Sequence, residues 1–361
     1  MNLLTFFKKT PEKPAQGTIR LPEDFKPYQD VWIQGHLFKS GKRSCARRYK
    51  LIYDCLRERY RPGFTLLDIG ASEGYFSIRL AEDLQAHPTM LEKKRSLKLV
   101  ASMQRNRDLR LQSGEISAAS LMKQGQFDVI IALSIVHHFS DWGRIVKHVL
   151  SMGDTVIIEL PSENERSTKR SDSATGMLNV LQWYQPKLIG ETSGYAEEFK
   201  RQIYVVDFPA LPHLPHLVKG VVTAGRSSSA RQKKHYQGAV KELLGITLFP
   251  GTLNLVIDKK LYFKNAIKID SEKGPYHLFP CKVEGIPSYI VKPPRAKNRS
   301  DSLEIFSEFH LREVFGLNDG DSILVELDPN HLGTRKEIEY AVKTYSSPQE
   351  EQPDEDLAVR P

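Results

Sequence analysis

The sequence predicts an α/β domain followed by a small six-stranded β-barrel domain. Between about residues 65 and 160, short apolar segments alternate with amphipathic helical segments, which is typical of a parallel sheet covered by helices on both faces. After about residue 217, short strands separated by turns dominate, which is typical of a small barrel. The 361 residues are enough for two domains of ordinary size.

Apolar spacing marks the individual helices and strands. The spacing of Leu51, Ile52, Cys55 and Leu56 gives one apolar face and predicts a helix over residues 49–60. The α/β region that follows predicts strand 65–69, helix 75–84, strand 89–91, helix 96–104, strand 109–111, strand 127–133, helix 142–150 and strand 155–160. The barrel strands are predicted at 217–223, 252–257, 276–283, 286–291, 303–306 and 322–327, with turns at Glu284-Gly285 and Asp319-Gly320.

Composition places the boundaries between these regions. Residues 1–20 lack periodicity, residues 162–175 are charged and Ser-rich as in a surface loop or lid, and a Pro- and His-rich run precedes the barrel. The predicted parts are an N-terminal arm over 1–39, the α/β domain over 40–206, a linker over 207–216, the barrel over 217–330, and a C-terminal helix with a disordered acidic tail over 331–361.

The charge is basic and unevenly distributed. Lys and Arg number 52 against 44 Asp and Glu, and residues 331–361 hold four basic and seven acidic residues, so the surplus lies on the rest of the chain. Such a surplus suits a phosphate-bearing partner: a nucleotide, a nucleic acid or an anionic glycan. Charge alone does not choose among these three.

The three cysteines, Cys45, Cys55 and Cys281, form no Cys-x-x-Cys pair and have no histidine at zinc-site spacing. We therefore expect a reduced compartment and no structural metal. No apolar run approaches the roughly 20 residues that cross a bilayer, and the N-terminus lacks a signal-peptide core. The expected location is cytoplasmic, without membrane insertion.

The segment 66–76, Leu-Leu-Asp-Ile-Gly-Ala-Ser-Glu-Gly-Tyr-Phe, places a buried strand, a tight glycine turn and a helix start in succession. Glycines in such a turn let the backbone approach a ligand and leave helix N–H groups available. Glu92 ends the next strand 24 positions after Asp68, where a carboxylate can accept both hydroxyls of a ribose, and Glu115 follows the third strand. A plain α/β turn would show the same glycines, so the later acidic residues carry the nucleoside interpretation.

This segment and residues 127–139, which end in His-His-Phe, resemble the class I methyltransferases that use S-adenosylmethionine. The resemblance covers about residues 40–205 and implies a Rossmann-like, seven-stranded domain. The cofactor residues it implies are Asp68, Gly70 and Gly74 at the methionine end, Glu92 at the ribose and Glu115 at the adenine edge, with Ser72 also among the cofactor-binding residues. Ser72 stands where many members have a further glycine. A nicotinamide-binding domain is the competing interpretation, but its Gly-x-Gly-x-x-Gly spacing is not met.

The absence of one motif limits the chemical class of the methyl acceptor. No Asn-Pro-Pro-Tyr type motif of amino-group methylation follows the 127–133 strand, which favours an oxygen acceptor on a small molecule or glycan. His137 or His138 can serve as the general base, or the pair can simply close the strand and pack over the cofactor. A basic cluster before the domain can hold an anionic acceptor or form a solvated helix face; its members are Lys39, Lys42, Arg43, Arg47, Arg48 and Lys50.

Three stretches of the barrel region resemble the archaeal CTP-dependent riboflavin kinases. They are Gly-Val-Val-Thr-Ala-Gly at 220–225, the run 243–255 with its Pro-Gly-Thr-Leu-Asn-Leu core, and Leu-Glu-Ile at 303–305 leading into 311–321. Together they span about residues 218–327 and keep the order of that family.

The resemblance implies a role for several residues. Thr252 and Asn254 would hold Mg²⁺, and Glu304 would contact the phosphoryl acceptor. The nucleotide contacts implied are Gly225, Arg226, Phe309, His310, Leu311 and Arg312, with Arg312 as the phosphate ligand. The family's glycine-rich loop is replaced here by a longer, more polar run over 225–231, and its flavin-contacting Thr falls near Ala296. The acceptor is therefore riboflavin or another hydroxyl compound.

Together these features predict a bifunctional enzyme that uses S-adenosylmethionine, CTP and Mg²⁺. The expected substrates are a small-molecule or glycan hydroxyl, with riboflavin among the candidates and nucleic acid less favoured. The alternative is an RNA-binding methyltransferase whose barrel is a non-catalytic binding module. Against that alternative, few aromatic residues accompany the basic clusters, so no base-stacking platform is evident.

Overall fold

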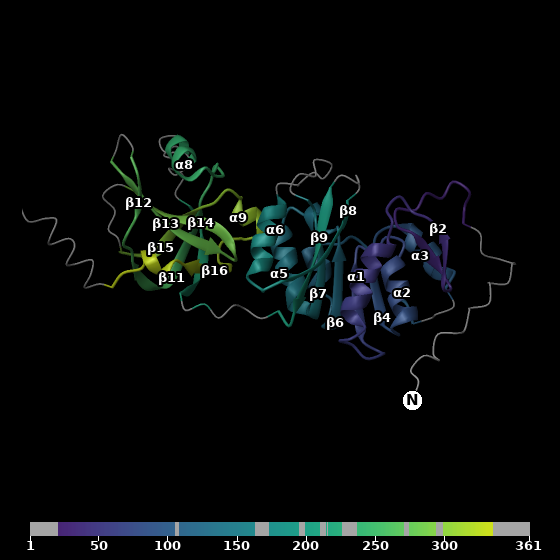
Figure 1. Ribbon diagram of the computed structural model, residues 1–361. Coiled ribbons are helices and arrows are strands. Elements are labelled where there is room, and N and C mark those ends of the chain that lie inside the picture. The colour runs from purple at the N-terminus through teal and green to yellow at the C-terminus, as the bar shows by residue number, and fades with distance from the viewer. Residues whose placement is uncertain are drawn as a thin grey trace, which may run out of the picture. The chain divides into compact units, whose positions relative to one another are not determined.

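The computed structural model describes residues 21–104, 108–162, 173–194, 199–209, 214, 216–225, 237–270, 274–293 and 299–334. The chain forms two compact units, with the main boundary between residues 213 and 214 (Figure 1). Each unit contains one seven-stranded sheet and hydrophobic clusters of its own.

The first unit is built on a mixed sheet with the strand order β5-β4-β3-β6-β7-β9-β8. Its strands are β3 (Thr65–Ile69), β4 (His87–Glu92), β5 (Arg110–Ser113), β6 (Phe127–Leu133), β7 (Gly153–Leu160), β8 (Lys187–Ser193) and β9 (Lys200–Asp207). The strands β5, β4, β3, β6 and β7 are parallel, and β9 and β8 add an antiparallel hairpin. The carboxyl ends of the parallel strands therefore meet at one edge, where α/β sheets bind ligands. This sheet confirms the predicted α/β class.

Helices cover both faces of this sheet. They are α1 (Ala46–Leu56), α2 (Tyr75–Asp83), α3 (Arg95–Ser102), α4 (Ala118–Leu121), α5 (Trp142–Met152) and α6 (Ser173–Gln182). One face carries α1 and α2, whose Ile52 and Phe76 pack in a single core cluster with the strand residues Leu66, Val129 and Ile157. The helix α5 contacts both α4 and α6, and α5 and α6 contact β7.

Several elements of this unit were not expected from the sequence. A short hairpin, β1 (Val31–Ile33) with β2 (His36–Lys39), lies in the range assigned to the N-terminal arm. Its Val31 and Ile33 are buried in a cluster with Leu97 of α3. The hairpin β8–β9 supplies the two strands that the resemblance to a seven-stranded domain implied but that the apolar pattern did not locate, and α6 begins within the stretch interpreted as a surface loop.

The second unit is an antiparallel barrel, as predicted. Its strands are β10 (Leu217–Thr223), β11 (Leu253–Tyr262), β12 (Ile267–Ile269), β13 (Tyr276–Val283), β14 (Ile286–Lys292), β15 (Arg299–Phe306) and β16 (Ser322–Leu327). Six of them close a ring in the order β13-β14-β15-β11-β10-β16, because β16 pairs back onto β13. The short β12 adds to the free side of β13. Helices α8 (Gln237–Leu244) and α9 (Leu311–Val314) complete the described part, with the 3₁₀ turn η2 (Pro329–His331).

The tight turns of the barrel follow from local chemistry. Glu284 and Gly285 join β13 to β14 with φ values of +49° and +89°. Two consecutive positive values define the turn that matches the twist of an antiparallel hairpin. Gly320, in the predicted turn before β16, has a φ of +92°. The predicted C-terminal helix lies outside the described residues.

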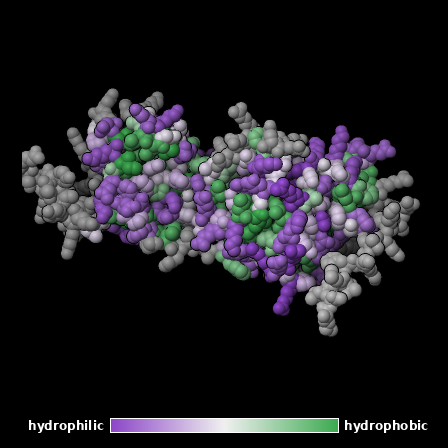
Figure 2. All heavy atoms as spheres, viewed as in Figure 1, coloured by the Kyte–Doolittle hydropathy of each residue, from purple (hydrophilic) through white to green (hydrophobic). Residues whose placement is uncertain are grey.

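The described surface is mostly polar. Figure 2 shows hydrophilic side chains over much of the visible face of both units, interrupted by separate hydrophobic patches. In the described ranges, no helix has the length and apolar character needed to span a bilayer. The same ranges contain no group of three or more His, Cys, Asp and Glu side chains arranged as a metal site.

Candidate functional site

The glycine turn after β3 has a backbone suited to close ligand approach. Gly70, Ser72 and Gly74 have φ values of +77°, +54° and +79°. A Cβ atom on Gly70 would lie 3.0 Å from the side chain of Ile135, and one on Gly74 would lie 2.9 Å from that of Leu97. Both positions therefore require glycine for conformation and for space. Ser72 adopts the same left-handed region without that freedom.

Two acidic residues predicted for the cofactor lie beside this turn. Asp68 is buried and accepts a hydrogen bond of 2.7 Å from Ser77 Oγ. Burial raises the pKa of Asp68 to about 7, and the nearby Glu92 carboxylate adds to this, while the Ser77 bond opposes it. Glu92 accepts three backbone N–H bonds, from Ser72 at 2.8 Å, from Lys93 at 2.8 Å and from the following residue at 3.0 Å.

The backbone bonds to Glu92 hold its carboxylate at the end of β4, next to the glycine turn. Glu115 lies two residues after β5, so it belongs to the same carboxyl edge of the sheet, and its side chain is exposed. The structure therefore brings Asp68, Ser72 and Glu92 into one cluster, with Glu115 further along the edge.

A segment before the α/β sheet docks on this turn. The backbone N–H of Gln29 donates to Glu73 Oε2 at 2.8 Å, and Ser72 Oγ donates to the same oxygen at 2.7 Å. The Asp30 carboxylate accepts the backbone N–H groups of Gly41 and Cys45, both at 2.9 Å. Sequence periodicity could not reveal this docking, because the contacts join residues up to 44 positions apart through single side chains.

The loop after β6 carries the two candidate general bases. His137 is buried and His138 is exposed, with their ring centres 4.2 Å apart. Partial burial lowers the pKa of His138, and the cations Arg201, Lys93 and Lys94 lower it further. The imidazole of His138 is therefore uncharged near neutral pH and can accept a proton, whereas the burial of His137 fits a packing role.

The predicted basic cluster divides into two groups. Arg43 and Arg48 are buried and directed at the Glu159 carboxylate. Lys39 is half-buried, and the other three members, Lys42, Arg47 and Lys50, are exposed. Neither of the two alternatives, an acceptor site or a solvated face, anticipated two buried arginines.

Glu159, at the end of β7, is the centre of a polar network. Arg43 donates to both of its oxygens, with distances of 2.7 and 3.2 Å, and Arg48 Nη1 lies 3.7 Å away. Ser134 Oγ donates to Oε2, and Thr192 Oγ1 donates to Oε1 at 2.9 Å. Burial would raise the pKa of Glu159, but the two arginines and the hydroxyl bond outweigh it and hold the pKa at about 2.

No sequence motif pointed to Glu159, Ser134, Thr192 or Arg201 as site residues. The available signal was an acidic residue near the end of an otherwise apolar strand, Val-Ile-Ile-Glu-Leu at 156–160. A buried carboxylate in such a strand needs cationic partners.

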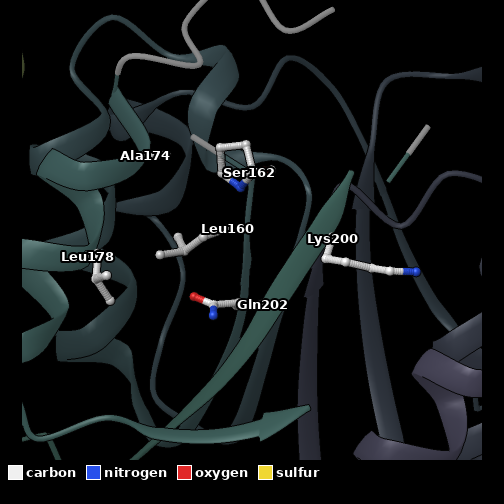
Figure 3. A pocket seen from close by; sticks show the side chains of 7 residues that line it. Leu160, Ser162, Ala174, Leu178, Lys200 and Gln202 are labelled. Atoms are coloured by element: carbon white, nitrogen blue, oxygen red, sulfur yellow. The ribbon is translucent and has the colours of Figure 1, made fainter. Parts of the chain in front are cut away.

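A cavity of about 320 Å³ lies beyond the carboxyl end of β7, between α6 and β9. Its lining comprises Leu160, Pro161, Ser162, Ala174, Leu178, Lys200 and Gln202. Figure 3 shows Leu160 and Gln202 directed toward the cavity and Lys200 extending away from it. The volume is that of a pocket for a small molecule.

In the barrel, Thr252 and Asn254 lie side by side at the start of β11. Asn254 Nδ2 is 3.3 Å from Thr252 Oγ1. Asn254 pairs with Thr223 of β10 on one side and with Glu304 of β15 on the other. A Cβ atom on Gly225 would lie 2.7 Å from Asn254 Nδ2, so the chain after β10 passes close to this amide. The structure therefore brings three predicted ligand-contacting residues and Gly225 together.

The predicted nucleotide residues border the same region. A pocket of about 30 Å³ is lined by Thr252, Phe309, His310, Leu311 and Arg312, among others. Arg312 Nη2 donates to the backbone oxygen of Thr223 at 2.6 Å and to Asp319 at 2.8 Å. The rings of Phe249 and His310 stack, with centres 4.3 Å apart and planes 10° apart. Arg226 and Ala296 lie outside the described residues.

Glu304 shares the barrel with an unusual lysine. Lys292 is buried, and burial lowers its pKa to about 8, although the carboxylates of Asp301 and Glu304 oppose the change. Its Nζ lies 3.4 Å from the Ser302 carbonyl oxygen. Nothing in the sequence pattern distinguished this lysine from a surface residue, because it ends a strand beside prolines.

Solved structures similar to the chain as a whole include the bifunctional kinase-methyltransferase WbdD, with a TM-score of 0.43, 18% identity, and coverage of 88% of this chain and 69% of that one. The first unit is similar to the magnesium protoporphyrin IX methyltransferase of Synechocystis PCC 6803, with a TM-score of 0.34 and 17% identity, over 45% of this chain and 76% of that one. The strand order already described gives the first unit a Rossmann-like, methyltransferase-like fold.

The family match at the level of sequence falls in the barrel. The CTP-dep_RFKase family, described as "Domain of unknown function DUF120", matches residues 222–327. The riboflavin kinase of Sulfurisphaera tokodaii is 32% identical over 127 residues, which cover 30% of this chain and 93% of that enzyme. The riboflavin kinase of Archaeoglobus fulgidus is 35% identical over 107 residues, covering 26% of this chain and 45% of that longer protein. Through its C-terminal domain, the chain belongs to the CTP-dependent riboflavin kinase family.

Proposed function

We propose that the protein is a bifunctional enzyme that transfers a methyl group from S-adenosylmethionine in its first unit and a phosphoryl group from CTP in its barrel. One observation carries the proposal. Thr252, Asn254 and Glu304 lie close together in a domain of the CTP-dependent riboflavin kinase family. The phosphoryl acceptor is riboflavin or another hydroxyl compound. The methyl acceptor is a hydroxyl on a small molecule or glycan.

The donor set in the barrel suits Mg²⁺. The Thr252 hydroxyl and the Asn254 carboxamide present neutral oxygen ligands, and Mg²⁺ in proteins keeps several waters and phosphate oxygens beside one or two such ligands. The chain at Gly225 passes close to the Asn254 carboxamide. CTP would supply the transferable phosphoryl group, and Mg²⁺ would neutralise the negative charge of the phosphates.

The rest of the barrel chemistry is positioning. Arg312 is held by Thr223 and Asp319, which fixes its guanidinium for contact with a phosphate oxygen. The stacked rings of Phe249 and His310 give a flat surface beside the pocket. Glu304, opposite Asn254 on the neighbouring strand, is placed to orient the acceptor hydroxyl.

The glycine turn and the acidic residues of the first unit suit S-adenosylmethionine. The turn with Gly70 and Gly74 brings the backbone close to a ligand, and Glu92 is fixed at the end of β4 with its carboxylate facing the turn. S-adenosylmethionine would supply an electrophilic methyl group. His138 would accept the proton of the acceptor hydroxyl, since its imidazole is uncharged near neutral pH.

The test is calorimetric titration of the full-length protein with S-adenosylhomocysteine, then with CTP and Mg²⁺, with ATP as the control nucleotide. We expect binding of both ligands and preference for CTP over ATP. Binding of S-adenosylhomocysteine alone would contradict the kinase half of the proposal, and binding of CTP alone would contradict the methyltransferase half. Turnover assays with riboflavin then identify or exclude that acceptor.

A further inference from the structure

A strap ahead of the first sheet, defined as residues 27–43, is bound directly to the glycine turn. The backbone N–H of Gln29 donates to Glu73 Oε2 at 2.8 Å. The side-chain oxygen of Gln29 accepts the backbone N–H of Tyr75, the first residue of α2, at 3.4 Å. Both bonds end on the turn or on the helix that it opens, so the strap and the turn form one rigid piece.

The strap is also closed on itself at Tyr28. The backbone N–H of Arg43 donates to the Tyr28 carbonyl oxygen at 3.0 Å. A Cβ atom on Gly41 would lie 2.2 Å from the carbonyl carbon of Gln29, so a larger residue at 41 would force the two arms of the strap apart. The backbone of Tyr28 is therefore fixed beside the glycine turn.

The Tyr28 ring lies near the end of β4. Lys94 Nζ is 5.2 Å from the ring centre, a distance typical of a cation–π contact. Lys94 follows β4 by two residues, and its backbone N–H donates to the Glu92 carboxylate at 3.0 Å. The ring is thus held close to the carboxylate that is placed for the ribose.

The hydroxyl of Tyr28 lies toward the end of β6. Burial lowers the pKa of the Arg43 guanidinium, but the Glu159 carboxylate and the Tyr28 side chain raise it, so that the pKa lies above its usual value. The Tyr28 hydroxyl is therefore close to this guanidinium. Arg43 Nη1 donates to Ser134 Oγ at 2.6 Å, and Ser134 follows β6 directly.

The order of the strands determines what Tyr28 covers. β3 lies between β4 and β6, and the glycine turn follows β3. A side chain that reaches from the end of β4 to the end of β6 therefore crosses in front of this turn, at the edge where α/β sheets bind ligands. Gln29 and Asp30 are buried, whereas Tyr28 is half-buried, so its ring keeps open surface at this edge.

We propose that the Tyr28 ring packs against the middle of S-adenosylmethionine, where the ribose joins the sulfonium. This inference rests on the proposed methyltransferase function and adds a cofactor-binding residue to it. Glu92 is placed for the ribose at the end of β4, and His138, the proposed base, follows β6. The ribose and the sulfur then lie between these two strands, under Tyr28. An aromatic ring packs on the apolar side of a ribose and attracts a cation such as sulfonium.

The test is calorimetry on the full-length protein with S-adenosylhomocysteine and 5′-methylthioadenosine, which share the ribose and the sulfur atom. Tyr28→Phe keeps the ring, and Tyr28→Leu removes it. The matched control is Tyr60→Leu. Tyr60 is also half-buried, but its hydroxyl donates to the Asp128 carbonyl oxygen at 2.9 Å, near the start of β6 and therefore at the opposite edge of the sheet.

We expect Tyr28→Leu to weaken both ligands about tenfold, and Tyr28→Phe to leave both within about threefold, because the ring supplies the contact. Tyr60→Leu should change neither affinity. A loss confined to S-adenosylhomocysteine would place Tyr28 at the amino-acid end of the ligand. An equal loss in Tyr28→Phe would assign the effect to the hydroxyl. Either result, or unchanged affinities in Tyr28→Leu, would overturn the ring contact.

Hydroxyl-radical footprinting of the wild type keeps the proposal testable where Tyr28→Leu does not fold, as melting temperatures would show. Mass spectrometry measures the oxidation rates of Tyr28 and Tyr60 with and without saturating S-adenosylhomocysteine. The rate at Tyr28 should fall several-fold, and the rate at Tyr60 should not change. Equal rates at Tyr28 in both states would refute the contact while leaving the methyltransferase function intact. Absence of S-adenosylhomocysteine binding to the wild type would refute that function, and the role of Tyr28 with it.

Discussion

Thr252 directly precedes β11 and Asn254 is the second residue of that strand, and their side chains lie together, with Asn254 Nδ2 3.3 Å from Thr252 Oγ1. The double variant Thr252→Ala/Asn254→Ala removes both proposed Mg²⁺ ligands. We expect magnesium-dependent CTP turnover to fall by at least about a hundredfold, because metal affinity depends on every direct ligand. The affinity for S-adenosylhomocysteine should not change. Turnover assays and calorimetry on the same sample measure both.

The matched control for this variant is Asn265→Gly. Asn265 has a φ of +54°, which glycine tolerates, and its side chain donates to the Asn330 carbonyl oxygen, beyond the far end of β11. CTP turnover should stay near the wild-type rate. If the double variant lost CTP turnover and S-adenosylhomocysteine affinity to the same extent, the two ligands would not have separate sites.

Asp68 gives a prediction with a defined pH window. Its pKa in the folded protein is about 7, against about 3.9 in an unfolded chain. The folded state therefore binds the proton more tightly, so the contribution of Asp68 to stability is largest below pH 4 and is lost as the pH rises to about 7. A shift of this size corresponds to on the order of 4 kcal/mol, at about 1.4 kcal/mol per unit.

The Asp68→Asn variant tests this sign. The amide cannot ionise and can still accept the hydrogen bond from Ser77. We expect the wild type to lose more stability than Asp68→Asn between pH 5 and pH 8, measured by urea unfolding in the absence of cofactor. A larger pH-dependent loss in the variant would show that Asp68 is ionised without cost in the folded protein.

At the scale of elements, Arg79 of α2 joins the hairpin β1–β2 and the helix α1 to α2. Its guanidinium carbon is 3.7 Å from the centre of the Tyr49 ring in α1 and 4.2 Å from that of Trp32 in β1. Its Nη1 donates to the Tyr75 hydroxyl at 2.9 Å, and its Nη2 donates to Asp83 at 3.2 Å. One side chain therefore joins three elements that are separate in the sequence.

Replacement of this arginine by methionine keeps much of the packing volume and removes the charge. Two cation–π contacts and the lost hydrogen bonds should together cost about 2 kcal/mol. For a unit of this size, the melting temperature should fall by about 4–8 °C. The control Arg57→Met, whose guanidinium carbon is 5.9 Å from the Tyr53 ring, should change it by less than about 2 °C. Equal shifts would contradict the role given to Arg79.

The elements also show what the sequence can and cannot predict. β3, β6 and α5 were found because an apolar run or a helical stripe marks each of them. The hairpin β1–β2 was missed because its three- and four-residue strands are too short to show alternation. Its position depends instead on packing against α3 and on Arg79, and such long-range contacts leave no periodic signal.

The candidate sites also differ in whether a local sequence pattern marks their residues. Residues that lie close together in the sequence, such as Thr252 and Asn254 or Gly70 and Gly74, form recognisable motifs. Glu159 and Arg43 are 116 positions apart, and only the folded sheet brings them together. Their chemistry is equally specific, but no short pattern records it.

At the scale of the whole molecule, each unit has a closed sheet or layered core of its own. Separate cores allow two cooperative unfolding transitions, because each unit has hydrophobic clusters made of its own residues. The proposed ligands also belong to different units: S-adenosylmethionine to the first and CTP with Mg²⁺ to the barrel. Ligand binding should therefore stabilise the units separately.

Differential scanning calorimetry of the full-length protein tests this directly. A ligand at about one hundred times its dissociation constant stabilises the unit that binds it by about 2.7 kcal/mol. S-adenosylhomocysteine should raise one transition by several degrees and leave the other in place, whereas CTP with Mg²⁺ should do the reverse. The Thr252→Ala/Asn254→Ala variant should lose only the shift caused by CTP. A single transition that rises with either ligand would mean that the units unfold as one, and the independence of the two activities would then be refuted.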